Sequence, residues 1–81
     1  MIDYKYVEVK WLDATGENSV IDIEDALKMK PARVTSHGYL IKDTIGFIII
    51  AGTKYDDGMV SELVCIPKKW ILKISTIKKK K

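Results

Sequence analysis

The stretch Val7-Glu8-Val9-Lys10-Trp11 decides the fold class of this chain. Apolar and charged residues alternate along it, so Val7, Val9 and Trp11 share one face when the backbone is extended. A period of two residues is typical of a strand with one buried face and one solvated face. We therefore predict a strand here, with Trp11 packed in the core.

Four further strands are predicted, separated by residues that favour turns, over residues 34–42, 47–51, 61–66 and 71–74. The third strand, Phe47 to Ala51, is apolar at every position and should lie inside the sheet. Gly38 interrupts the second strand, where a glycine suits a bend or the close approach of another backbone. The pair Asp57-Gly58 predicts a hairpin turn, and Pro67 should end the fourth strand.

One helix is predicted over residues 22–30, within the long segment between the first two strands. Asp22 can cap the first turn, and Pro31 ends the helix. Ile23 and Leu27 are four residues apart and share one helical face, which we expect to pack on the domain. A helix of two turns depends on such tertiary contacts.

We predict a mainly β fold of the all-β class. The prediction follows from the number of short strands, their tight connections and the single long insertion. We expect a small five-stranded barrel with one short helix in the loop after the first strand, since closure removes exposed strand edges. The 81 residues suffice for one domain. Residues 1–77 are assigned to it, and Lys78 to Lys81 are predicted to be a disordered tail.

The run Ile66-Pro67-Lys68-Lys69-Trp70-Ile71 resembles the end of an SH3 domain. There a strand meets a proline, makes one short helical turn with an aromatic residue, and returns as the last strand. The resemblance implies an SH3-like barrel. The whole chain is also similar to a group of small uncharacterised proteins encoded by bacteriophages and prophages, which implies an origin but no activity. The residues that carry this similarity are 9–14, 31–41, Ile50-Ala51, Ile66-Pro67 and Ile71.

The formal charge of +3 belongs to the C-terminus, because the chain without the four lysines at 78–81 carries −1. The longest apolar run, Phe47 to Ala51, is far shorter than the roughly 20 residues of a membrane-spanning helix. The N-terminus lacks the basic start and apolar stretch of a signal peptide. We predict a protein of the bacterial cytoplasm without membrane contact. No pattern indicates its oligomeric state.

No group of residues predicts catalysis, a metal site or a cofactor site, so we do not expect an enzyme. His37 is the only histidine, and its neighbour Ser36 should point to the other face of the strand. Cys65 is the only cysteine, which excludes an internal disulfide. It lies in an apolar run and should be buried. Asp56 and Asp57 cannot supply the roughly six to eight oxygen ligands that calcium takes.

The predicted function is a non-enzymatic interaction module, an accessory protein that binds a host or viral protein. The alternative is weak nucleic-acid binding without sequence preference, since small barrels bind single strands through aromatic and lysine side chains. Trp70 has a second interpretation, in which it covers one end of the barrel. The candidate interaction surface comprises Lys68, Lys69, Trp70 and Tyr55. Nucleic-acid binding would use Lys68, Lys69, Trp70 and the lysine tail.

Overall fold

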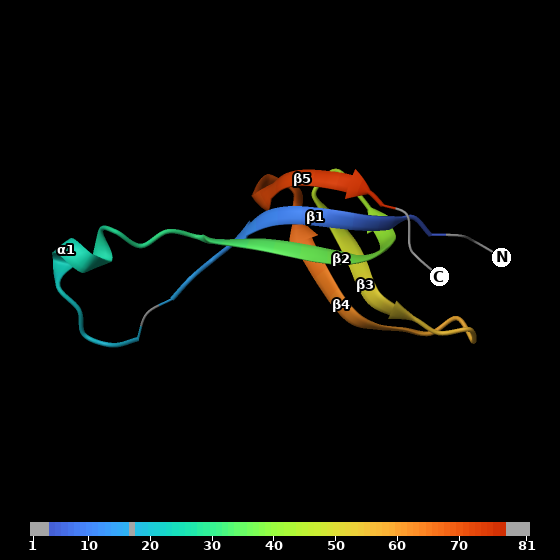
Figure 1. Cartoon of the computed structure of the whole chain (residues 1–81), viewed down its shortest axis with the longest axis horizontal. Coiled ribbons are helices and arrows are strands. Elements are labelled where there is room, and N and C mark those ends of the chain that lie inside the picture. The colour runs from blue at the N-terminus through green and yellow to red at the C-terminus, as the bar shows by residue number, and fades with distance from the viewer. Residues whose placement is uncertain (1–3, 17, 78–81) are drawn as a thin grey trace.

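The computed structural model describes residues 4–16 and 18–77, which form a single antiparallel sheet of five strands (Figure 1). The sheet order is β4-β3-β2-β1-β5. The mainly β prediction is confirmed, and each strand covers the predicted residues with short extensions. The elements are β1 (Tyr6–Asp13), α1 (Ile23–Ala26), β2 (Ala32–Asp43), β3 (Phe47–Lys54), β4 (Val60–Pro67), the 3-10 turn η1 (Lys68–Trp70) and β5 (Ile71–Thr76).

The sheet bends but does not close. Strands β4 and β5 are its two edges, and no backbone pairing joins them within the described residues. The predicted closed barrel is therefore not confirmed. Two irregularities bend β5 and β2, since the bulged strand bends and its local twist increases. The extra residue is Leu72 of β5, opposite Lys10 and Trp11, and Ile41 of β2, opposite Ile49 and Ile50. The turn η1 carries the chain from one edge of the sheet to the other.

The core lies on the inner face of the bent sheet. Its buried members are Val7, Val9, Trp11, Ile48, Ile50 and Ile66. The prediction for Trp11 is confirmed, because its ring is 8% exposed and its indole Nε1 donates a hydrogen bond to Ser36 Oγ at 3.0 Å. Burial of each large aliphatic side chain stabilises the fold by about 1.5–3 kcal/mol. The alternation in β1 thus points its apolar residues inward, as the sequence predicts.

Gly38 of β2 lies against the backbone of Ala51 in β3. A Cβ atom at this position would lie 2.7 Å from the carbonyl oxygen of Ala51. That distance is well inside van der Waals contact, so any side chain would force the two backbones apart. The predicted close approach at Gly38 is therefore confirmed.

Cys65 is exposed, and the prediction that it is buried is wrong. In β4, Ile66 points inward and pairs with buried Ile48, so the preceding residue must point outward. Leu63, two residues before Cys65, is accordingly 58% exposed. The run 63–66 is apolar at every position, and its own pattern does not distinguish the inward face from the outward one.

The predicted helix over residues 22–30 is reduced to the four residues of α1. Asp22 stands at its N-cap but makes no capping hydrogen bond with its side chain. Ile23 and Leu27 do not pack on the domain, since they are 78% and 81% exposed. Without a tertiary contact to stabilise it, the helix ends after about one turn.

Candidate functional site

The four residues of the predicted interaction surface do not form one surface. Tyr55 lies in the turn between β3 and β4, whereas Lys68, Lys69 and Trp70 form η1 at the far end of β4. The whole length of β4 separates the two groups, as Figure 1 shows. They must therefore be considered as two sites.

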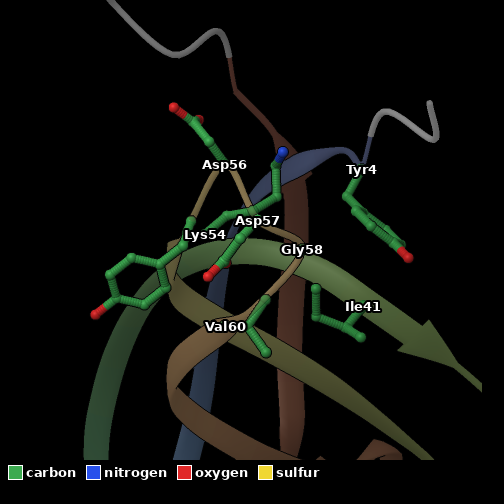
Figure 2. Close-up of a pocket in the computed structure, with 8 residues that line it drawn as sticks. Tyr4, Ile41, Lys54, Asp56, Asp57, Gly58 and Val60 are labelled. Atoms are coloured by element: carbon green, nitrogen blue, oxygen red, sulfur yellow. The ribbon is translucent and has the colours of Figure 1, made fainter.

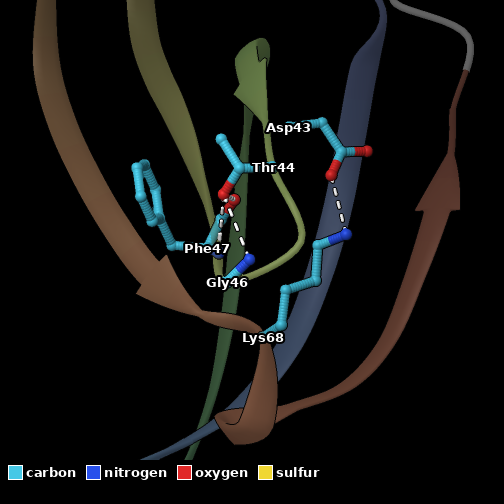
Figure 3. A network of polar contacts seen from close by, with 5 residues as sticks. All are labelled: Asp43, Thr44, Gly46, Phe47 and Lys68. Atoms are coloured by element: carbon cyan, nitrogen blue, oxygen red, sulfur yellow. Dashed lines mark hydrogen bonds and ion pairs between the residues drawn. The ribbon is translucent and has the colours of Figure 1, made fainter.

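Lys68 has a structural role. Its Nζ atom lies 2.7 Å from Asp43 Oδ1, and its backbone N–H donates to the carbonyl oxygen of Gly46 at 2.9 Å (Figure 3). In the same turn the hydroxyl of Thr44 accepts hydrogen bonds from the N–H groups of Gly46 and Phe47. Lys68 thus ties η1 to the turn between β2 and β3, and its charge is already paired.

Trp70 is the last residue of η1 and is 42% exposed. Together with Lys69 it lines a hollow of about 260 Å³, whose other wall comprises Leu12, Asp13, Ala14 and Pro31. This hollow lies where the segment between β1 and β2 leaves the sheet and returns to it.

Tyr55 lies beside a different hollow, of about 490 Å³, at the β3–β4 hairpin. Figure 2 shows Tyr4 and Ile41 on one side of it, with Asp56 and Asp57 of the hairpin on the other. The carboxylate of Asp57 accepts the N–H of Met59 at 3.0 Å, and Gly58 has a φ of 90°. These features build the hairpin turn that Asp57-Gly58 predicts.

The most unusual surface is the segment between β1 and β2, which we call the arm and define as residues 14–31. It extends away from the sheet, and α1 lies far beyond the end of the strands (Figure 1). The molecule is accordingly 55 Å long but only 25 and 21 Å in its other two dimensions. Every described residue of the arm is exposed.

The arm carries large apolar side chains that contact no core. Their exposed fractions are 102% for Val20, 39% for Ile21, 78% for Ile23, 81% for Leu27 and 43% for Met29. Among its described residues, the acids lie around the start of α1, at Asp22, Glu24 and Asp25, and the lysines follow α1, at Lys28 and Lys30. Sequence reasoning missed this site because the apolar spacing of Ile23 and Leu27 is also that of a helix packed on its own domain.

The base of the arm is fixed to the sheet. Asp13, the last residue of β1, pairs with Ala32, the first residue of β2. Next to them, the hydroxyl of Thr15 donates a hydrogen bond to the carbonyl oxygen of Lys30 at 2.9 Å. The two ends of the arm therefore lie next to each other. The pairing of β1 with β2 does not require the residues between them.

His37 and Ser36 face opposite sides of β2, as predicted. Ser36 accepts from Trp11, while His37 Nε2 lies 3.0 Å from Glu8 Oε2 on the outer face. These two side chains cannot act together on one substrate, because a nucleophile and its base must lie within hydrogen-bond reach.

Among the described residues, no three His, Cys, Asp or Glu side chains are grouped so that they could hold a metal ion. None of the helices in that part of the chain has the length and apolar character needed to cross a membrane. No protein-family model, curated protein or solved structure matches the chain.

Proposed function

We propose that this chain is a non-enzymatic protein-interaction module and that the arm, residues 14–31, binds its partner. The observation that carries the proposal is the exposure of every described arm residue, including Val20, Ile23 and Leu27. Contiguous apolar surface on a small domain is a common mark of a protein–protein contact.

The arm is longer than the fold requires. Asp13 pairs directly with Ala32, and two antiparallel strands that end opposite each other need a connection of only about two to five residues. The arm instead exposes large aliphatic side chains. Each of them would contribute about 1.5–3 kcal/mol if a partner buried it. Binding is the function that uses these side chains.

The proposed mode is a helix bound in an apolar groove of the partner. Ile23 and Leu27 lie one turn apart on the same helical face, and Val20 precedes Ile23 by three residues. The backbone N–H of Leu27 already bonds to the carbonyl of Ile23, so α1 is a nucleus from which the helix can extend. A groove that covers these residues would supply the contact that the predicted helix over 22–30 lacks.

We also propose that the domain is an open variant of the SH3-like architecture and the accessory protein of a bacteriophage or prophage, acting in the bacterial cytoplasm. Support for the architecture comes from the five antiparallel strands and from the turn η1 between β4 and β5. Support for the origin comes from the sequence resemblance, whose residues 31–41 form most of β2.

The test is a matched capture experiment with the full chain. The double variant Ile23→Asp/Leu27→Asp places two carboxylates on the arm, where neither side chain contributes to the core. The control, Ile45→Asp/Met59→Asp, adds the same charge at positions that are 99% and 63% exposed on the β2–β3 and β3–β4 turns. Each immobilised protein is incubated with a bacterial lysate, with and without nuclease, and bound proteins are compared.

The proposal expects one protein to be retained by the original chain and by the control but lost from the arm variant. Retention should be insensitive to nuclease. Equal retention by the arm variant would contradict the proposal. Sedimentation of the purified chain tests self-association separately, and a dimer that the arm variant abolishes would identify the partner as a second copy.

A second candidate function is weak binding of single-stranded nucleic acid through Lys69, Trp70 and the lysine tail. The observation in its favour is the partly exposed ring of Trp70 beside the unpaired Lys69 in one hollow. The tail itself lies outside the described residues. Replacement of Trp70 by alanine should then weaken oligonucleotide binding without affecting protein capture by the arm.

A further inference from the structure

Three cationic side chains gather on the outer face of the sheet, from three adjacent strands. Lys10 comes from β1, Arg33 from β2 and Lys73 from β5, and all three are exposed. They line one hollow of about 330 Å³ together with Trp11, Val34, Thr35 and Leu72. Residues from three separate parts of the sequence thus meet at one place on the surface.

The strand register brings these charges together. Lys10 is directly opposite Lys73 on one side and Thr35 on the other. Residues that face each other across antiparallel strands point to the same face, with Cβ atoms about 4.5–5.5 Å apart. Arg33 is opposite Leu12, one diagonal step from Lys10 on that face. The arrangement follows from backbone pairing and does not depend on how the long side chains rotate.

No carboxylate neutralises this cluster in the described part of the chain. The salt bridges there are Lys28–Asp25, His37–Glu8 and Lys68–Asp43. The nearest acid along β1 is Glu8, and His37 already holds it at 3.0 Å. Like charges directly opposite each other in a sheet are destabilising. An anion bound between Lys10 and Lys73 would remove that repulsion.

The net charge conceals this cluster. Without its last four lysines the chain carries −1, which by itself argues against a basic surface. The structure separates the charges, however, because Asp22, Glu24 and Asp25 lie on the arm and Asp56 and Asp57 on the β3–β4 hairpin. The outer face of β5, β1 and β2 is left locally positive.

We infer that Lys10, Arg33 and Lys73 form a binding site for phosphate groups. A guanidinium presents a planar set of donors that matches phosphate oxygens, and ammonium groups add charge from the sides. Thr35 supplies a hydroxyl donor, and Leu72, which is 53% exposed, offers an apolar contact beside the charges. The phosphate can belong to a single-stranded nucleic acid or to a free phosphate compound. The site is distinct from the arm and stands independently of the proposed partner binding.

The test compares two double variants of the full chain that lose equal charge. Lys10→Gln/Lys73→Gln removes two cations of the site, and Lys28→Gln/Lys30→Gln removes two from the arm. Binding of a fluorescent oligothymidine is measured by anisotropy over a series of salt concentrations. The lysine tail is present in both variants, so its contribution cancels. Thermal melting of both variants checks that the fold is intact, and the exposed positions predict that it is.

The site variant should lose affinity about tenfold or more at 50 mM salt, and its salt slope should fall by about 1.4, which corresponds to two phosphate contacts on a single strand. The arm variant should keep the affinity and slope of the original chain. Equal weakening of both variants would overturn the assignment, because it would show only general charge attraction. Absence of binding by the original chain to this oligonucleotide and to inorganic phosphate would overturn it as well.

A second measurement distinguishes the two sources of phosphate. Inorganic phosphate and thymidine monophosphate are titrated into the chain while backbone amide shifts are recorded. Shifts centred on Lys10, Arg33 and Lys73 that saturate at the same concentration as the oligonucleotide indicate a free phosphate compound. Shifts at these residues that saturate only at much higher concentration indicate a nucleic-acid backbone. Shifts centred elsewhere contradict the site.

Discussion

The inner face of the sheet and the arm use the same kind of residue in opposite ways. Ile48 and Ile50 in β3 are 0% and 1% exposed, whereas Ile23 and Leu27 in the arm are 78% and 81% exposed. In the sheet, cross-strand pairing brings an apolar residue opposite another one, as with Ile48 and Ile66. In the arm, no second layer built from residues 4–16 or 18–77 covers α1. Side-chain chemistry alone thus does not determine burial, which requires an opposing surface.

This difference in burial separates residues that stabilise the fold from residues that are available to a partner. A domain of this size has a small net stability, and its few buried side chains supply most of it. The arm adds exposed apolar surface without adding to that core. Mutations should therefore divide the molecule into a region where stability is lost and a region where only binding is lost.

The largest effect is expected in the core of β3. Ile48→Ala should lower the free energy of unfolding by about 2–5 kcal/mol, because it removes buried methyl groups and leaves a cavity. Urea unfolding followed by tryptophan fluorescence measures the change, and Ile23→Ala in the arm is the matched control. A loss below about 1 kcal/mol for Ile48→Ala would contradict its position in the core.

A backbone contact gives the next largest effect. Gly38→Val should lower the free energy of unfolding by about 1–3 kcal/mol, because its Cβ would meet the carbonyl oxygen of Ala51 at 2.7 Å. Gly16→Val in the arm is the control, since no atom lies within 4 Å of an added Cβ there. Equal melting temperatures for the two valine variants would show that β2 and β3 are not held this closely.

Shortening the arm should have a smaller effect of the opposite sign. Replacement of residues 16–29 by a four-residue glycine–asparagine linker keeps Thr15 and Lys30, whose hydrogen bond fixes the base of the arm. Because this roughly halves the loop, the free energy of unfolding should rise by about 0.6 kcal/mol. Urea unfolding reports the change. A cooperative fold that is lost on shortening would mean that the arm belongs to the folding unit.

Single truncations on the arm should have the smallest effect. Ile23→Ala and Leu27→Ala should each change the free energy of unfolding by no more than about 0.5 kcal/mol, since both side chains already face solvent. Partner capture should fall in the same variants. A destabilisation of more than about 1 kcal/mol in either variant would show that α1 packs on the sheet in solution.

Much of the fold could be predicted from the sequence, because strand formation leaves a local signal. The alternation around Val9 predicts both β1 and its buried face, and Asp57-Gly58 predicts the β3–β4 hairpin. Cys65 could not be placed correctly, because the apolar run 63–66 has no period and only the pairing of Ile66 with Ile48 sets its face. Closure of the barrel depends on long-range geometry that no single stretch encodes.

The candidate sites were harder to predict than the strands. The charge cluster joins Lys10, Arg33 and Lys73, which are distant in sequence and meet only through the register of three strands. The three residues of η1 are adjacent in sequence, so the sequence predicts them as one surface. Asp43, however, pairs with Lys68 and neutralises its charge. The spacing of Ile23 and Leu27 correctly predicts a helical face but cannot show whether that face is covered.

The most direct test of the account is amide hydrogen exchange on the full chain without any partner. The N–H groups of Ala26 and Leu27 bond to the carbonyls of Asp22 and Ile23 at α1, whereas β3 is an inner strand that pairs with β4 and β2. Amides of the arm should exchange at rates close to those of an unfolded peptide, while Ile48 and Ile50 should exchange only through global unfolding. Arm amides as strongly protected as Ile48 would contradict this, because they would show that the arm is part of the cooperative fold and not a free binding element.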